Sequence, residues 1–114
     1  MPERSIRISS AEGKWVLRAG GAVLGETSCA LELSEGDLKP VIYFPRRDVA
    51  MAFLEPSGQE TTCPHKGRAR YYSIHTKSTV LENAAWSYEE PTSEIAPLRD
   101  HLAFDLLQVT VERL

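Results

Sequence analysis

Thirteen residues, Thr61–Ser73, hold the densest group of reactive side chains in the chain, with a cysteine, a histidine, a lysine, two arginines and two tyrosines. Cys63 and His65 place two soft metal ligands close together, and the same thiol beside His65 or Lys66 has neighbours that can stabilise a thiolate. A structural zinc site normally uses paired knuckles such as Cys-x-x-Cys, which the sequence lacks. We therefore expect no metal, and Cys63 is a candidate nucleophile whose alternative is a buried structural cysteine.

The dipeptide Lys66-Gly67 suggests a second kind of site. A lysine next to a glycine can present an ammonium and a backbone N–H together to an anion. No Gly-x-x-x-x-Gly-Lys motif occurs, so this is not a P-loop. The alternative is that Lys66 forms an ion pair with Glu55 or Glu82 and fixes the turn.

Aromatic and amide side chains complete the candidate ligand site. Tyr72 would share one strand face with Arg68 and Arg70, which either grip an anion or simply keep a strand edge charged. Asn83 lies three residues before Trp86, and an amide near an aromatic ring suits a sugar or a base. The alternative for Trp86 is a place in the core. The predicted ligand-binding residues are Lys66, Gly67, Tyr72, Asn83 and Trp86.

Short segments in which apolar and polar residues alternate, separated by Gly and Pro, must position these residues. They predict a mainly β fold with antiparallel strands. The expected strands lie around residues 6–8, 15–17, 22–27, 30–33, 41–44, 68–76, 79–86, 102–104 and 109–111. Residues 87–93 are expected to form a loop, followed by a short helical turn. We also expect the strand after Gly67 to pair with the strand that carries Asn83 and Trp86.

One short helix is predicted around residues 46–54. Pro45 suits a helix start, and Val49, Ala52 and Phe53 recur at helical spacing. Pro56, followed by a glycine, would end this helix.

Composition and charge limit the classes of partner. The 114 residues are 42% hydrophobic and 25% charged, which predicts one globular domain over 1–114. The net charge of −3 argues against nucleic-acid binding. No apolar run approaches the length of about 20 residues that spans a bilayer, and the start lacks the apolar core of a secretory signal. Two isolated cysteines, Cys29 and Cys63, then indicate free thiols and a cytoplasmic protein.

Several blocks of the sequence resemble the bacterial family called domain of unknown function 427 over about residues 20–104. The blocks are Pro40–Pro45, Asp48–Pro56, Thr61–Gly67 with Tyr71–Ser73, Glu82–Tyr88 and Leu102–Phe104. The resemblance implies a small β-tent of antiparallel strands and little about function. A nucleotidyltransferase label attached to the family requires a Gly-Ser loop and paired aspartates that hold magnesium, and the chain has neither Gly-Ser nor Asp-x-Asp.

Agreement with the family pattern differs among the candidate residues. Cys63, Lys66, Gly67, Tyr71, Asn83 and Trp86 match the pattern, whereas His65, Arg68 and Arg70 depart from it.

The function that we predict is a binding module for a small polar or anionic ligand in a shallow pocket, with no cofactor. Lys66 would supply charge, Asn83 hydrogen bonds, and Tyr72 or Trp86 a stacking wall. One alternative is an enzyme that uses Cys63 with Lys66 or His65. The other is a structural or interaction protein that pairs through its sheet edges as a homodimer.

Overall fold

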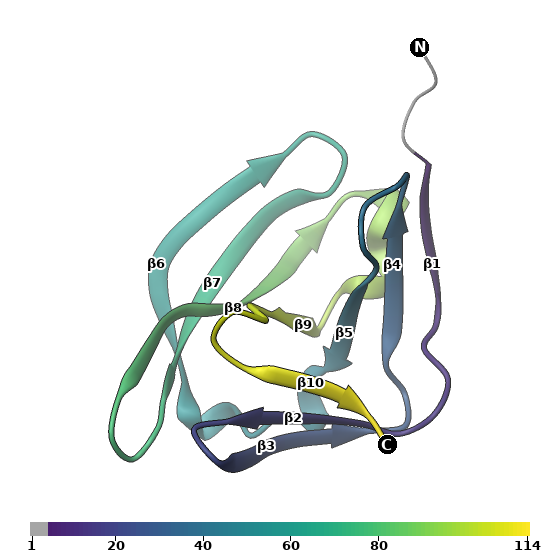
Figure 1. Cartoon of the computed structure of the whole chain (residues 1–114). Coiled ribbons are helices and arrows are strands. Elements are labelled where there is room, and N and C mark those ends of the chain that lie inside the picture. Colours follow the sequence, from purple (N-terminus) through teal and green to yellow (C-terminus); the bar gives the residue numbers. More distant parts are fainter. Residues whose placement is uncertain (1–4) are drawn as a thin grey trace.

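Strands and tight connections make up most of the protein (Figure 1), whose computed structural model describes residues 5–114. Within these described residues the strands are β1 (Ile6–Ser10), β2 (Trp15–Ala19), β3 (Ala22–Thr27), β4 (Leu31–Glu35), β5 (Val41–Pro45), β6 (Leu54–Cys63), β7 (Gly67–His75), β8 (Val80–Pro91), β9 (His101–Phe104) and β10 (Thr110–Arg113). Short 3-10 helical segments occur in the same part of the chain, namely η1 (Arg46–Asp48), η2 (Met51–Phe53) and η3 (Ser93–Leu98). The mainly antiparallel β fold predicted from the sequence is confirmed.

The strands form two antiparallel sheets. The larger has the order β1-β4-β5-β9-β8-β7-β6, and the smaller has the order β10-β2-β3. Figure 1 shows the smaller sheet across one end of the larger sheet, whose flanks β6–β7 and β1–β4–β5 rise on either side of β8 and β9. The predicted pairing of the two central strands is confirmed, since β7 runs antiparallel to β8 with Tyr71 opposite Trp86.

The short helix predicted around residues 46–54 is split into two 3-10 segments, η1 and η2, because Val49 between them is extended. Val49 forms a β-bridge with Gly25, and the Ala50 N–H donates to the Leu24 carbonyl at 2.7 Å. Phe53, expected on the same buried face as Val49, is 48% exposed. Backbone pairing with β3 therefore overrides the local helical pattern.

One strand, β6, was not predicted, and another, β8, extends beyond its prediction. β6 covers the region where Pro56 was expected to stop a helix, and β8 continues to Pro91 through the predicted loop. β6 is an edge strand that pairs only with β7, and an edge strand tolerates a proline. Most of its residues are exposed, so no buried alternation marks it in the sequence.

Two hydrophobic clusters use the central strands of the larger sheet. Tyr43 and Phe44 are consecutive on β5 and belong to different clusters, as expected when successive side chains point to opposite faces. The first cluster includes Phe44 and Tyr72, and the partly buried Trp15 packs against it. The second includes Tyr43 and Tyr88, with Tyr71 and Trp86 packed against it. The face with the second cluster contains the candidate site.

Candidate functional site

Lys66 forms an ion pair with Glu35 instead of the expected Glu55 or Glu82. Its Nζ lies 2.7 Å from a Glu35 carboxylate oxygen, and the two side chains are only 18% and 15% exposed. Lys66 follows β6 in a tight turn, where its backbone N–H donates to the Cys63 carbonyl at 3.2 Å, and Glu35 ends β4. This pair links the two flanks of the larger sheet, and its charges cancel.

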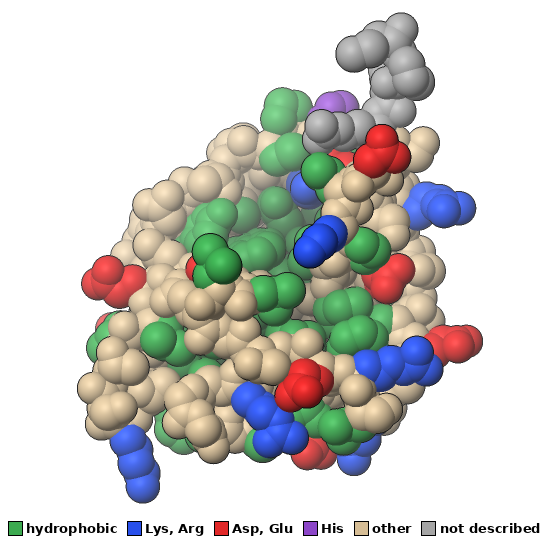
Figure 2. Space-filling view, in the orientation of Figure 1, with side chains coloured by type: hydrophobic (Ala, Val, Ile, Leu, Met, Phe, Trp, Pro, Cys, Tyr) green, Lys and Arg blue, Asp and Glu red, His purple; other side chains and the backbone are tan. Residues whose placement is uncertain are grey.

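A cavity of about 220 Å³ opens beside this ion pair, and we call it the tyrosine cavity. Besides Lys66 and Glu35, it is lined by Tyr43, Tyr71, Trp86 and Tyr88, by Leu33, Leu38 and Val41, and by Lys39. Figure 2 shows this side of the molecule hollowed between the two flanks, with side chains of the hydrophobic class, in which tyrosine is included, in the hollow. Such a combination of apolar walls and a few polar groups is typical of small-molecule sites.

The aromatic walls are positioned by strand register. Tyr71 and Trp86 are opposite each other on β7 and β8, and their ring centroids lie 6.2 Å apart at an interplanar angle of 41°. The Trp86 indole N–H donates to the Tyr43 hydroxyl at 3.3 Å, which ties β8 to β5. The Tyr71 hydroxyl shares a hydrogen bond with the Thr61 hydroxyl at 3.3 Å. These contacts fix the rings in place, and fixed rings suit a planar ligand.

Two of the tyrosine hydroxyls in the cavity are strongly biased toward the neutral form. Burial raises the pKa of Tyr43 well above 10, although the hydrogen bond from Trp86 opposes the shift. Burial also raises the pKa of Tyr88 to about 12, with smaller contributions from the nearby Cys63, Tyr71 and Glu35. At neutral pH these phenols are hydrogen-bonding groups and not bases.

Gly67 lies next to Lys66, and its backbone closely approaches the backbone of β8. It does not line the tyrosine cavity. Its φ is +103°, and a Cβ placed on it would lie 2.8 Å from the Glu90 carbonyl oxygen. The glycine therefore lets β7 and β8 start their pairing, which positions Lys66 indirectly.

Tyr72 belongs to the opposite face of β7 and contacts a separate charged cluster. Its hydroxyl donates to the Glu89 carboxylate, which also pairs with Arg46 at 3.2 Å and with Arg70 at 3.4 Å. Burial alone would raise the pKa of Glu89, but the hydrogen bonds from Tyr72 and Arg70 and the positive charges of Arg46 and Arg70 outweigh it and lower this pKa. Arg70 is thus occupied by a carboxylate of the protein, and Tyr72 lines no wall of the tyrosine cavity.

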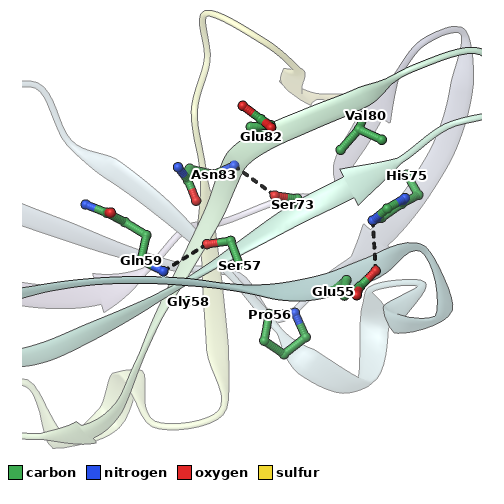
Figure 3. Close-up of a pocket in the computed structure, with 10 residues that line it drawn as sticks. All are labelled: Glu55, Pro56, Ser57, Gly58, Gln59, Ser73, His75, Val80, Glu82 and Asn83. Carbon is green, nitrogen blue, oxygen red and sulfur yellow. Dashed lines mark hydrogen bonds and ion pairs between the residues drawn. The ribbon is translucent and has the colours of Figure 1, made fainter.

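Asn83 lines a different hollow of about 610 Å³, shown in Figure 3, which we call the polar trough. The other lining residues are Glu55, Pro56, Ser57, Gly58, Gln59, Ser73, His75, Val80 and Glu82. Register shifts in the β6–β7 and β7–β8 pairs and the positive φ of Asn83 (52°) interrupt the sheet here. Most of these side chains are exposed, so the trough is a hydrated surface hollow and a weaker candidate than the tyrosine cavity.

Cys63 and His65 are the two soft metal ligands that the sequence places close together. Within residues 5–114, no group of three or more His, Cys, Asp or Glu side chains is placed to hold a metal ion. Cys63 is a half-buried free thiol, and His65 is exposed, with its carbonyl accepting a hydrogen bond from the Thr92 hydroxyl at 2.7 Å. Lys66, the other expected helper of Cys63, is occupied by Glu35.

Comparison with known families decides the chain's relationships. Residues 7–113 match the family described as Domain of unknown function (DUF427). The chain belongs to this DUF427 family. No curated protein matches the sequence. None of the helices within residues 5–114 is long and apolar enough to cross a membrane. The DUF427 description names no activity, so any functional proposal must rest on the site itself.

Of the five ligand-binding residues predicted for this DUF427 chain, the structure brings Lys66 and Trp86 together in one cavity. Gly67, Tyr72 and Asn83 lie outside it. Sequence reasoning missed Glu35 and Tyr43, because only the sheet order places β4 and β5 near β7 and β8. Tyr88 had a usable sequence signal, since period-two alternation places it on the same face of its strand as Trp86.

Proposed function

We propose that this protein binds a small polar ligand with a flat ring in the tyrosine cavity. The observation that carries the proposal is that four aromatic side chains surround a cavity bordered by the neutralised pair Lys66–Glu35. Trp86 and Tyr71 would offer ring surfaces, and the hydroxyls of Tyr43 and Tyr88 would offer hydrogen bonds.

The ion pair favours an uncharged polar ligand over an anion. A free, partly buried lysine in the position of Lys66 would attract a carboxylate or a phosphate, but Lys66 already has a partner at 2.7 Å. Lys39 also lines the cavity, but its side chain is exposed, so water and salt screen its charge. An anion would have to compete with Glu35 and would lie close to its carboxylate, which is unfavourable in a partly buried site. A neutral group with both a donor and an acceptor, such as an amide, meets Glu35 and Lys66 without changing the net charge.

Three ligands of nearly the same shape test this preference: benzamide, benzoate and benzamidine. Fragments of this size bind weakly, so all three are added at the same high concentration, at which the fragment with the lowest dissociation constant stabilises the fold most. At about ten times its dissociation constant, a bound ligand stabilises the fold by about 1.4 kcal/mol, and the thermal unfolding midpoint rises. We expect benzamide to raise the midpoint most. A larger rise with benzoate would contradict the proposed neutral ligand, and no rise with any of the three would contradict binding of planar fragments in this cavity.

Variants locate the bound fragment. Trp86→Leu removes one ring wall of the tyrosine cavity, so the benzamide effect should disappear. Gln59→Ala alters the exposed polar trough, and the benzamide effect should remain. The opposite pattern would move the site to the trough.

A further inference from the structure

A second, larger cavity lies against the tyrosine cavity and has a different chemical character. It has a volume of about 400 Å³, and we call it the apolar cavity. Lys39, Val41 and Trp86 line both cavities, so the two are adjacent and meet at these three residues. A ligand held against Trp86 on one side therefore lies next to the space on the other.

The apolar cavity lies where the two sheets meet. Trp15 on β2 and Val111 on β10 come from the smaller sheet, while Ile42 on β5 and Phe104 on β9 come from the larger one. Protein interiors are close-packed, and apolar atoms that face an unfilled space lose dispersion contacts. An apolar group that entered this space would regain those contacts and leave water.

The carboxylate that lines this cavity already has hydrogen-bond partners. The Asp105 carboxylate accepts hydrogen bonds from the Leu107 backbone N–H and from the Gln108 side-chain amide, both at 3.0 Å. The adjacent Leu106, which lines the cavity, is 68% exposed. The apolar cavity therefore offers contact surface to a hydrocarbon group, and an exposed leucine lies at its edge.

We infer that the natural ligand is amphipathic, with a planar polar head in the tyrosine cavity and an unbranched apolar arm of a few carbons in the apolar cavity. This inference rests on the proposed function, because the head must first lie in the tyrosine cavity. Trp86 would contact both parts of such a ligand, the head with one side of its indole and the arm with the other.

N-alkyl benzamides test the arm separately from the head. Dissociation constants of benzamide and of its N-methyl, N-propyl and N-butyl derivatives are measured by calorimetric titration of the full chain. Each methylene that enters the apolar cavity should tighten binding by about fourfold. The N-butyl compound should thus bind about 60-fold more tightly than the N-methyl compound.

Leu106→Asp is the test variant, because a side chain as exposed as Leu106 can be replaced by a charged one without burying that charge. The ratio of the N-methyl to the N-butyl dissociation constant should fall at least tenfold in this variant. Val23→Asp is the matched control, because Val23 is a 49% exposed side chain on β3 that lines neither cavity. It should keep the full ratio.

The outcomes separate the two proposals. If benzamide binds but the alkyl series shows no gain, the apolar arm is wrong and the head site stands. If the alkyl series shows the same gain in affinity in Leu106→Asp, the proposed site of the apolar arm is also wrong. The gain would then come from the hydrophobicity of the ligand alone and not from contacts in the apolar cavity. If neither benzamide nor its derivatives bind, both proposals fail.

Discussion

The ion pair of Lys66 and Glu35 is the single contact that most affects the interpretation of the site. Both side chains are largely buried, so removing one partner leaves a poorly solvated charge. Lys66→Met should therefore lower the free energy of unfolding by about 3 kcal/mol, measured by urea denaturation. Replacing both partners, as in Lys66→Met with Glu35→Leu, should restore most of this loss because no charge remains unpaired.

A surface pair provides the control for this effect. Lys14 and Glu26 lie 3.4 Å apart with side chains about half exposed, and Lys14→Met should cost less than about 1 kcal/mol. Equal losses in Lys66→Met and Lys14→Met would show that the buried pair has no special role.

Tyr88 provides a pH-dependent test of cavity burial. Its folded pKa of about 12 lies above the ordinary value of 10.0, so the folded state retains the phenolic proton more strongly than the unfolded state. The associated stability is complete below pH 10 and is lost as the pH rises toward 12. Tyr88→Phe should weaken this alkaline decline and remove one late step from the ultraviolet titration of tyrosinate. A Tyr88 step at the ordinary value would contradict the burial.

Residue types predicted part of this site, and sheet order supplied the rest. Lys66 and Trp86 could be found because a lysine beside a glycine and an aromatic ring near small residues are recognisable in a sequence. Glu35 could not be found, since nothing local distinguishes it from other glutamates of the chain. Tyr72 was misleading because its neighbour Tyr71, and not Tyr72, faces the cavity.

The turn between β6 and β7 depends on Gly67. Adding a single methyl group, by substitution with alanine, therefore tests this element. At φ +103° an alanine is strained, and its Cβ would lie 2.8 Å from the Glu90 carbonyl oxygen. Gly67→Ala should lower the free energy of unfolding by about 3 kcal/mol, measured by urea denaturation. Gly21→Ala is the control, since Gly21 also has a positive φ (82°) but has open space around it, and it should cost about 1 kcal/mol. Equal costs would contradict the close approach of the two strands.

Strands with buried side chains were the elements that the sequence predicted best. Trp15 and Leu17, and the run from Val41 to Phe44, show alternation or β-branched and aromatic residues, and both segments are strands. β6 escaped prediction because an exposed edge strand needs no buried alternation. The predicted helix is split into two 3-10 segments because Val49 pairs with Gly25, a contact between distant segments that no local pattern contains.

The whole molecule should unfold as one unit, because the two hydrophobic clusters share the central strands of the larger sheet. Each cluster has its own tryptophan, Trp15 in the first and Trp86 in the second. In the variants Trp86→Phe and Trp15→Phe, the remaining tryptophan reports on one cluster at a time. Its fluorescence transition in urea should coincide with loss of the far-ultraviolet circular dichroism signal of the same variant. Transitions at different urea concentrations would show that the two clusters are separable and contradict the predicted single domain.

The most direct test of the tyrosine cavity is a benzamide titration of the 15N-labelled chain followed by NMR. The Trp86 indole N–H donates to Tyr43 and borders the cavity, so its signal reports on the site itself. We predict saturable shifts of this indole signal and of the Tyr71 and Tyr88 backbone amides, while the side-chain amides of Asn83 and Gln59 in the polar trough stay unchanged. Shifts confined to those side-chain amides, or a Trp86 indole signal that does not move at saturating benzamide, would contradict a ligand site in the tyrosine cavity.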